Sequence, residues 1–144
     1  MHMIPFQYLE HTADIKFRAY GTTREEMLSN AASALFGAMI SPEQVTVQEV
    51  WPVELEAEEL EDLAYQWLSE IVFLFETESA VFSTFQVVLQ EGEEGRGWKL
   101  RAEIGGERMD LERHLFRSEV KAVTWHKFAI VKNELWCIQV VLDV

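Results

Sequence analysis

Carboxylate and imidazole groups gather near both ends of this 144-residue chain. Glu10, His11 and Asp14 stand together near the start, and Asp143 is the last residue but one. Oxygen-rich sites with a few carboxylates suit hard divalent cations such as Mg²⁺ or Ca²⁺, and a nearby histidine also admits Mn²⁺ or Zn²⁺. Asp14 and Asp143 are therefore candidate metal ligands, with Glu10 and His11 as possible neighbours. The alternative is that all four are solvated loop and chain-end residues.

Asp14 leads directly into a segment with the alternation of a β-strand. Ile15, Phe17 and Ala19 share one face, and the residues between them are polar or aromatic. A strand end is held firmly by its ladder yet stays open to solvent, so a carboxylate there can meet a ligand without full burial of its charge.

The last quarter of the chain, residues 120–144, predicts a β-hairpin around residues 133–134. With a two-residue turn, His126 pairs with Val141, and His126 and Asp143 then share a face of the hairpin. This register makes His126 a further possible neighbour of the site.

Together with the segments between these two regions, the sequence predicts one α+β domain that spans residues 1–144. Capping boxes that start at Thr22 and Thr23 predict a helix that ends before Pro42. Two main helices then pack on one side of a largely antiparallel sheet. The other predicted elements are strands at 45–57, 81–90 and 98–104, a helix at 60–77, and an irregular polar segment at 107–119.

An acidic run at residues 54–62 could be read as a metal site. The better explanation is that alternate glutamates form the solvent face of a strand, while the last acids occupy the first turn of a helix, where the helix dipole favours them. Pro52 cannot donate to a ladder, so this strand should lie at a sheet edge or carry a bulge.

Composition limits the partners of the protein. The net charge is −13, from 25 acidic and 12 basic residues, so the surface field should repel phosphate backbones, and direct nucleic-acid binding is not expected. The acidity instead favours divalent cations, a basic protein partner, or simple solubility. The single Cys137 excludes an internal disulfide, and neither a signal peptide nor a membrane span is apparent. We expect a soluble, cytoplasmic protein.

Four separated motifs resemble the archease family. They are Glu10-His-Thr-Ala-Asp14, the helix with Asp62-Leu-x-x-x-Trp67-Leu-x-Glu70, Lys121-Ala-Val-Thr-Trp-His126, and the closing Val-Val-Leu-Asp143-Val. The resemblance runs from about Phe6 to the end of the chain, in the right order and at the right total length.

The resemblance implies a fold and a function. The fold would be a strand-helix-strand-strand module enlarged by an inserted second unit. The protein would be a non-enzymatic activator of the RtcB-type RNA ligase in tRNA splicing and RNA repair, promoting ligase guanylylation and multiple turnover through a divalent metal such as Mg²⁺, Mn²⁺ or Ca²⁺.

The resemblance also implies roles for particular residues. Asp14 and Asp143 match the metal-binding carboxylates of the family, and Lys121 matches a basic residue needed for activity. His11 and His126 belong to matching motifs without an assigned role. Trp125 stands where the family usually has tyrosine.

Two alternatives to the activator remain open at this stage. A metal-dependent hydrolase or nucleotide-processing enzyme could use Asp14, Asp143 and His126, although no nucleophile or base is evident beside them. A general modulator or chaperone of RNA-modifying enzymes would bind through the acidic surface. The sequence leaves the physiological metal, the docking surface and the oligomeric state open.

Overall fold

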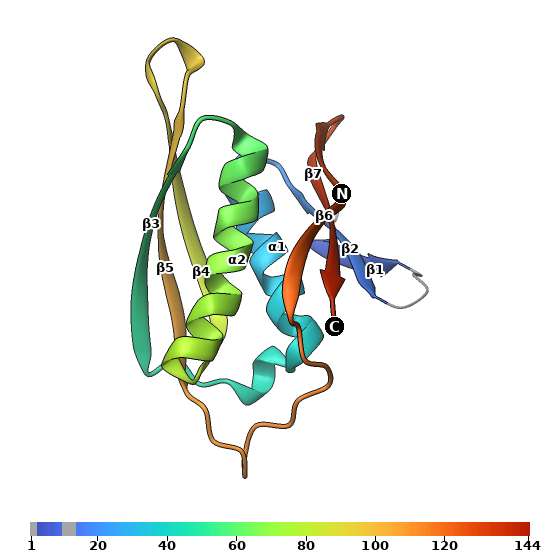
Figure 1. Cartoon of the computed structure of the whole chain (residues 1–144), viewed down its shortest axis with the longest axis vertical. Helices are drawn as coiled ribbons and strands as arrows, with labels where there is room; N and C mark the ends of the chain where they lie inside the picture. Colours follow the sequence, from blue (N-terminus) through green and yellow to red (C-terminus); the bar gives the residue numbers. More distant parts are fainter. Residues whose placement is uncertain (1–2, 10–13) are drawn as a thin grey trace.

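Two helices form a layer between two antiparallel sheets, as Figure 1 shows. The computed structural model describes residues 3–9 and 14–144. One sheet has the strand order β1-β2-β7-β6, with strands at Phe6–Leu9, Ile15–Gly21, Trp136–Asp143 and Ala122–Lys132. The other has the order β3-β5-β4, with strands at Glu49–Ala57, Trp98–Arg108 and Ala80–Glu91. Helices α1 (Arg24–Met39) and α2 (Leu60–Glu78) pack against strands of both sheets.

The chain order shows two strand-helix-strand-strand units, one inserted in the other. The outer unit is β2-α1-β6-β7, and the inner unit, β3-α2-β4-β5, enters between α1 and β6. In both units the first strand pairs with the last strand, and β1 extends the outer sheet. The α+β prediction and the inserted unit are confirmed. Helices cover one face of each sheet, as predicted, but the strands form two sheets rather than one.

The core lies in the helical layer, where local sequence signals agree with the structure. Phe17 and Ala19 of β2 are fully buried, as their alternation predicted. The indole N–H of Trp67 on α2 donates to the carbonyl of Leu28 on α1 at 3.0 Å, which joins the two helices. Thr23 caps α1 by accepting from the backbone N–H of Glu26 at 3.1 Å, so the predicted cap is confirmed.

Two strand boundaries differ from the prediction. The strand predicted from residue 45 begins only at Glu49, because the N–H of Thr46 donates to the Glu107 side chain at 2.6 Å instead of to a ladder. At the same end of the sheet, where Glu49 pairs with Gly106, β5 continues through Gly105 and Gly106. A Cβ on Gly106 would lie 1.9 Å from the Val81 carbonyl oxygen, so the glycine permits this close strand approach. Pro52 lies on β3, an edge strand, as predicted.

The register predicted for the C-terminal hairpin is wrong. Lys132 pairs with Trp136, so the turn has three residues, and the register shifts again between Thr124 and Ala129. Thr124 therefore pairs with Val141, the position that the two-residue turn had given to His126. The irregularity is a bulge in β6, where Lys127 has φ of 55°.

In the part of the chain that the structure describes, neither helix combines the length and apolar character that a membrane span requires.

Candidate functional site

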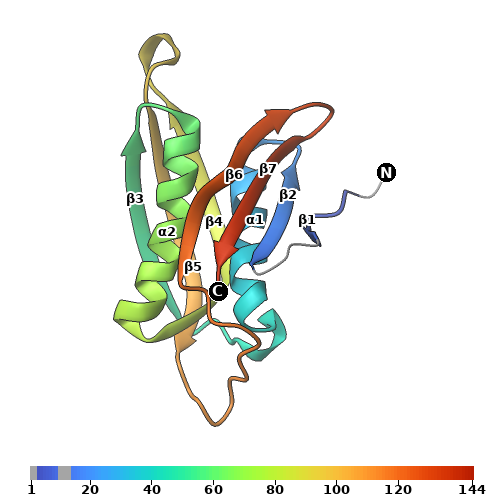
Figure 2. The same cartoon turned by 45° about the vertical axis from the view of Figure 1, so that its right-hand side comes forward.

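Three of the predicted site residues come together at one end of the four-stranded sheet. Asp14 immediately precedes β2, Asp143 ends β7, and Lys121 immediately precedes β6. Ile15 pairs with Leu142, so the next position along the register sets Asp14 opposite Asp143. The backbone N–H of Lys121 donates to the Asp143 carbonyl at 2.8 Å. Figure 2 shows this end of the sheet, which we call the carboxylate edge and define by Asp14, Lys121 and Asp143.

The alternation of β7 determines where the Asp143 carboxylate points. Leu142 is fully buried against the helical layer, so the side chain of Asp143 projects from the outer face of the sheet, where it is exposed. Asp14 is partly buried and Lys121 is exposed. Directly opposed residues on neighbouring strands have Cβ atoms about 5 Å apart, a separation that one cation can bridge with a carboxylate from each side.

The remaining predicted neighbours are Glu10, His11 and His126. Glu10 and His11 lie outside the described residues. His126 is exposed and lies in the β6 bulge, and Val141 pairs with Thr124, so the predicted pairing of His126 with Val141 is wrong.

The donor chemistry of the carboxylate edge fits a hard divalent cation. Such ions take six to eight oxygen ligands, of which Asp14 and Asp143 can provide the charged ones while waters complete the shell. Among the described residues, no group of three or more His, Cys, Asp or Glu side chains could hold a metal ion. A two-carboxylate site of this kind would bind its ion weakly.

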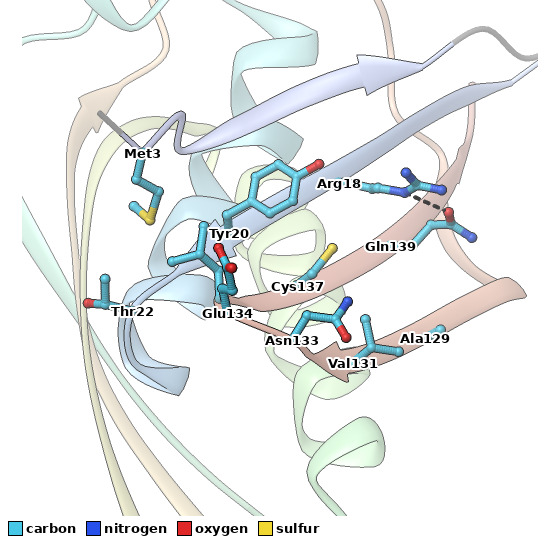
Figure 3. Close-up of a pocket in the computed structure, with 11 residues that line it drawn as sticks. Met3, Arg18, Tyr20, Thr22, Ala129, Val131, Asn133, Glu134, Cys137 and Gln139 are labelled. Carbon is cyan, nitrogen blue, oxygen red and sulfur yellow. Dashed lines mark hydrogen bonds between the residues drawn. The ribbon is translucent and has the colours of Figure 1, made fainter. Parts of the chain in front are cut away.

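A hollow of about 940 Å³ lies on the same outer face, toward the hairpin turn (Figure 3). Its lining includes Tyr20, Val131 and Cys137, and Arg18 donates from Nε to Gln139 Oε1 at 3.0 Å across the two central strands. Burial raises the pKa of the Cys137 thiol, which keeps it protonated and makes it a poor nucleophile.

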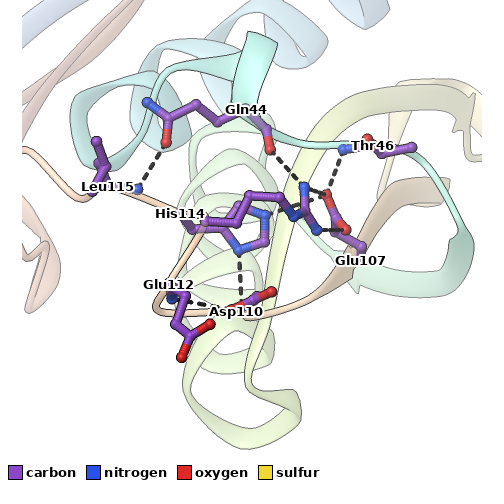
Figure 4. Close-up of polar contacts among 8 residues, drawn as sticks. Gln44, Thr46, Glu107, Asp110, Glu112, His114 and Leu115 are labelled. Atoms are coloured by element: carbon purple, nitrogen blue, oxygen red, sulfur yellow. Dashed lines mark hydrogen bonds and ion pairs between the residues drawn. The ribbon is translucent and has the colours of Figure 1, made fainter.

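A buried polar network fastens the two chain crossovers between the units, and the sequence did not reveal it (Figure 4). Glu107 is only 3% exposed, and its carboxylate accepts from both Nη atoms of Arg113, with the Nη1 bond at 3.1 Å. It also accepts from the Thr46 N–H at 2.6 Å and contacts His114 Nε2 at 3.2 Å. Because His114 Nδ1 accepts from the Asp110 N–H at 2.9 Å, the ring hydrogen belongs on Nε2, which donates to Glu107.

This network sets the charge state of Glu107. The hydrogen bonds from Arg113, assisted by those from Thr46 and His114, outweigh the effect of burial and lower the pKa of Glu107 to about 2. The carboxylate is therefore a structural anion. In sequence, Glu107, Arg113 and His114 formed part of an irregular mixed-charge segment, where no periodicity marks a buried residue.

The chain is similar in sequence to known proteins along nearly its whole length. The model of the Archease protein family matches residues 6–144. A protein archease of Methanosarcina mazei is 44% identical over 140 residues, covering 96% of this chain and 95% of that protein. A protein archease of Pyrococcus abyssi is 39% identical over 141 residues, covering 96% and 98%.

A solved structure gives the same result. The solution structure of Methanobacterium thermoautotrophicum protein 1598 superimposes with a TM-score of 0.87 at 38% identity, covering 97% of this chain and 99% of that one. The range that the family model matches contains Asp14, Lys121 and Asp143. On the family model, the relatives and the shared fold together, the chain belongs to the archease family.

Proposed function

We propose that this protein is a non-enzymatic activator of an RtcB-type RNA ligase in tRNA splicing and RNA repair. It would act in the cytoplasm, promoting guanylylation of the ligase and its multiple turnover. The proposal depends on one observation in this archease family member. Asp14, Lys121 and Asp143 come from three separate segments and meet at the carboxylate edge, where the strands of the sheet end.

The chemistry of this edge suits a nucleotidyl-transfer site in a partner. Asp14 and Asp143 would hold a divalent cation, Mg²⁺, Mn²⁺ or Ca²⁺, and the bound ion would supply positive charge to phosphate oxygens. The Lys121 ammonium is exposed beside them and would attract the same anionic groups. Weak metal binding by two carboxylates suits a site that presents its ion to another protein and then releases it.

The overall charge supports a protein partner. With a net charge of −13, the protein is attracted to a basic RNA-binding enzyme, while the RNA itself is repelled. The proposed role therefore requires contact with the ligase and no direct contact with nucleic acid.

Multiple-turnover RNA ligation tests the proposal. The ligase of the same organism is assayed alone, with wild-type protein, and with Asp14→Ala, Lys121→Ala or Asp143→Ala, each checked for folding. Glu54→Ala is the matched control, because Glu54 is an exposed carboxylate on the outer face of the other sheet, beside Arg101. We expect wild type and the control to stimulate turnover and the three edge variants to lose most of the stimulation.

Two other results would redirect the proposal. If wild-type protein leaves the ligase unchanged, the activator role is wrong. If the pure protein converts nucleotides in the presence of metal and without any partner, the hydrolase alternative takes its place.

A further inference from the structure

An exposed tryptophan stands on a preformed aromatic cluster between β6 and α2. Trp125 is 51% exposed, and its ring stacks on Tyr65 of α2 with centroids 4.3 Å apart and an interplanar angle of 11°. Phe128 packs edge-on against Trp125 at 5.0 Å and against Tyr65 at 6.0 Å. We call these three residues the aromatic platform.

The platform is held rigidly. The Tyr65 hydroxyl donates to the Val123 carbonyl at 3.0 Å, which ties α2 to β6 directly beside the rings. The β6 bulge lets both Trp125 and Phe128 pack against Tyr65. Within the bulge, Lys127 adopts a left-handed backbone conformation, which costs a non-glycine residue about 1 kcal/mol. Rigid aromatic residues lose little entropy on binding and are the commonest anchors of protein interfaces.

The platform is close to the carboxylate edge. Trp125 lies three residues after Ala122, which pairs with Asp143. The platform and the carboxylate edge therefore share the first part of β6, and a protein that docks on one can reach the other.

The charge beside the platform indicates what covers it. Helix α2 contains Glu61, Asp62, Glu70, Glu76 and Glu78 and no lysine or arginine. Glu61 and Asp62 are exposed and lie one helical turn before Tyr65, on the same side of the helix. Figure 1 shows α2 with one side left uncovered by either sheet. A guanidinium can stack on an indole while pairing with carboxylates nearby.

We infer that the aromatic platform anchors a basic segment of the protein partner by seating an arginine side chain on the exposed indole of Trp125. The guanidinium approaches from the α2 side, where Glu61 and Asp62 lie, and away from Lys127 on β6. This inference rests on the proposed function, since it gives the ligase a docking surface next to the carboxylate edge.

The test is the dissociation constant of the complex with the RtcB-type ligase, measured by calorimetry. Trp125→Ala should weaken binding at least about tenfold, equivalent to about 1.4 kcal/mol, and Trp125→Tyr should stay within about threefold of wild type. Trp125→Arg should weaken binding further, because it keeps a long side chain but repels the partner's arginine. Val88→Ala is the control, as Val88 is 62% exposed on β4 of the other sheet.

The outcomes distinguish failure of the proposed function from failure of the docking inference alone. If wild-type protein does not bind the ligase, the proposed function fails and the inference falls with it. If wild type binds and both folded Trp125 variants, Ala and Arg, bind equally well, the platform is not the anchor, although the activator role stands. Loss of binding in both, with the Val88 control unchanged, supports the platform.

Discussion

At the scale of single residues, the protein uses carboxylates in two ways. Glu107 is buried among four donors, from Arg113, Thr46 and His114, and serves to fasten the chain. Asp143 is exposed at a strand end and accepts no such set of bonds among the contacts described for it. A buried, satisfied acid contributes stability, whereas an acid at an open edge is available to a ligand.

The first prediction concerns Glu107 and pH. Its pKa in the folded protein, about 2, lies below the ordinary value of 4.5, so its stabilising contribution is complete above about pH 4.5 and is lost as the pH falls toward 2. Glu107→Gln should be less stable than wild type at pH 7, by about 2–3 kcal/mol. The substitution removes the negative charge that the side chains of Arg113 and His114 and the N–H of Thr46 bind. Urea unfolding followed from neutral to acid pH should show the two stabilities converging below about pH 4.5. If the free energies of unfolding of wild type and Glu107→Gln instead differed by the same amount at every pH, this explanation would be wrong.

At the scale of elements, local signals predicted what local physics determines. The cap at Thr23, the boundaries of α1 and α2, and the buried face of β2 all follow from side-chain spacing and capping, which act within a few residues. Strand partners could not be predicted this way. The hairpin register depends on a bulge at Lys127, and the bulge is accommodated by Trp125 packing against a helix some 60 residues earlier.

The same limit applied to the candidate site. Asp14 and Asp143 were identified because each stands at the end of a recognisable strand pattern. Their closeness follows from the pairing of β2 with β7, and the pairing of Glu107 with His114 follows from how the crossovers fold. Neither relation leaves a local pattern in the sequence.

The second prediction concerns the end of α2. Ser79 follows the helix with φ of 49° and ψ of 50°, a left-handed cap conformation that glycine adopts without cost. Ser79→Gly should therefore raise the free energy of unfolding by about 0.5–1 kcal/mol. Ser79→Ala is the matched control and should give no gain, since it keeps the Cβ. A glycine variant that is less stable than the alanine variant in urea unfolding would show that the cap is not strained.

At the scale of the whole molecule, the inserted unit carries much of the acidity. Its strand β3 and helix α2 together place a long series of carboxylates on the surface, and Glu54 and Glu56 pair with exposed cations of β5. Exposed pairs of this kind are worth little to stability, and under the proposed function the acidity serves to attract a basic partner.

The third prediction concerns salt. Because the net charge is −13, association with a basic ligase should be electrostatically steered, and its rate constant should fall about tenfold or more between about 0.05 M and about 0.5 M salt. The dissociation rate should change much less. Stopped-flow or surface-binding kinetics measure both. An association rate that does not depend on salt would rule out steering by the acidic surface.

The most direct test of the central claim is the rate at which the ligase becomes guanylylated, followed with labelled GTP at limiting divalent metal. Wild-type protein should accelerate this step, and the isosteric variants Asp14→Asn and Asp143→Asn should lose the acceleration because they keep the shape of the carboxylate edge and remove its charge. Equal acceleration by wild type and both variants would show that the carboxylate edge is not the working site. If wild type gives no acceleration, this archease family member does not activate the ligase at the step proposed.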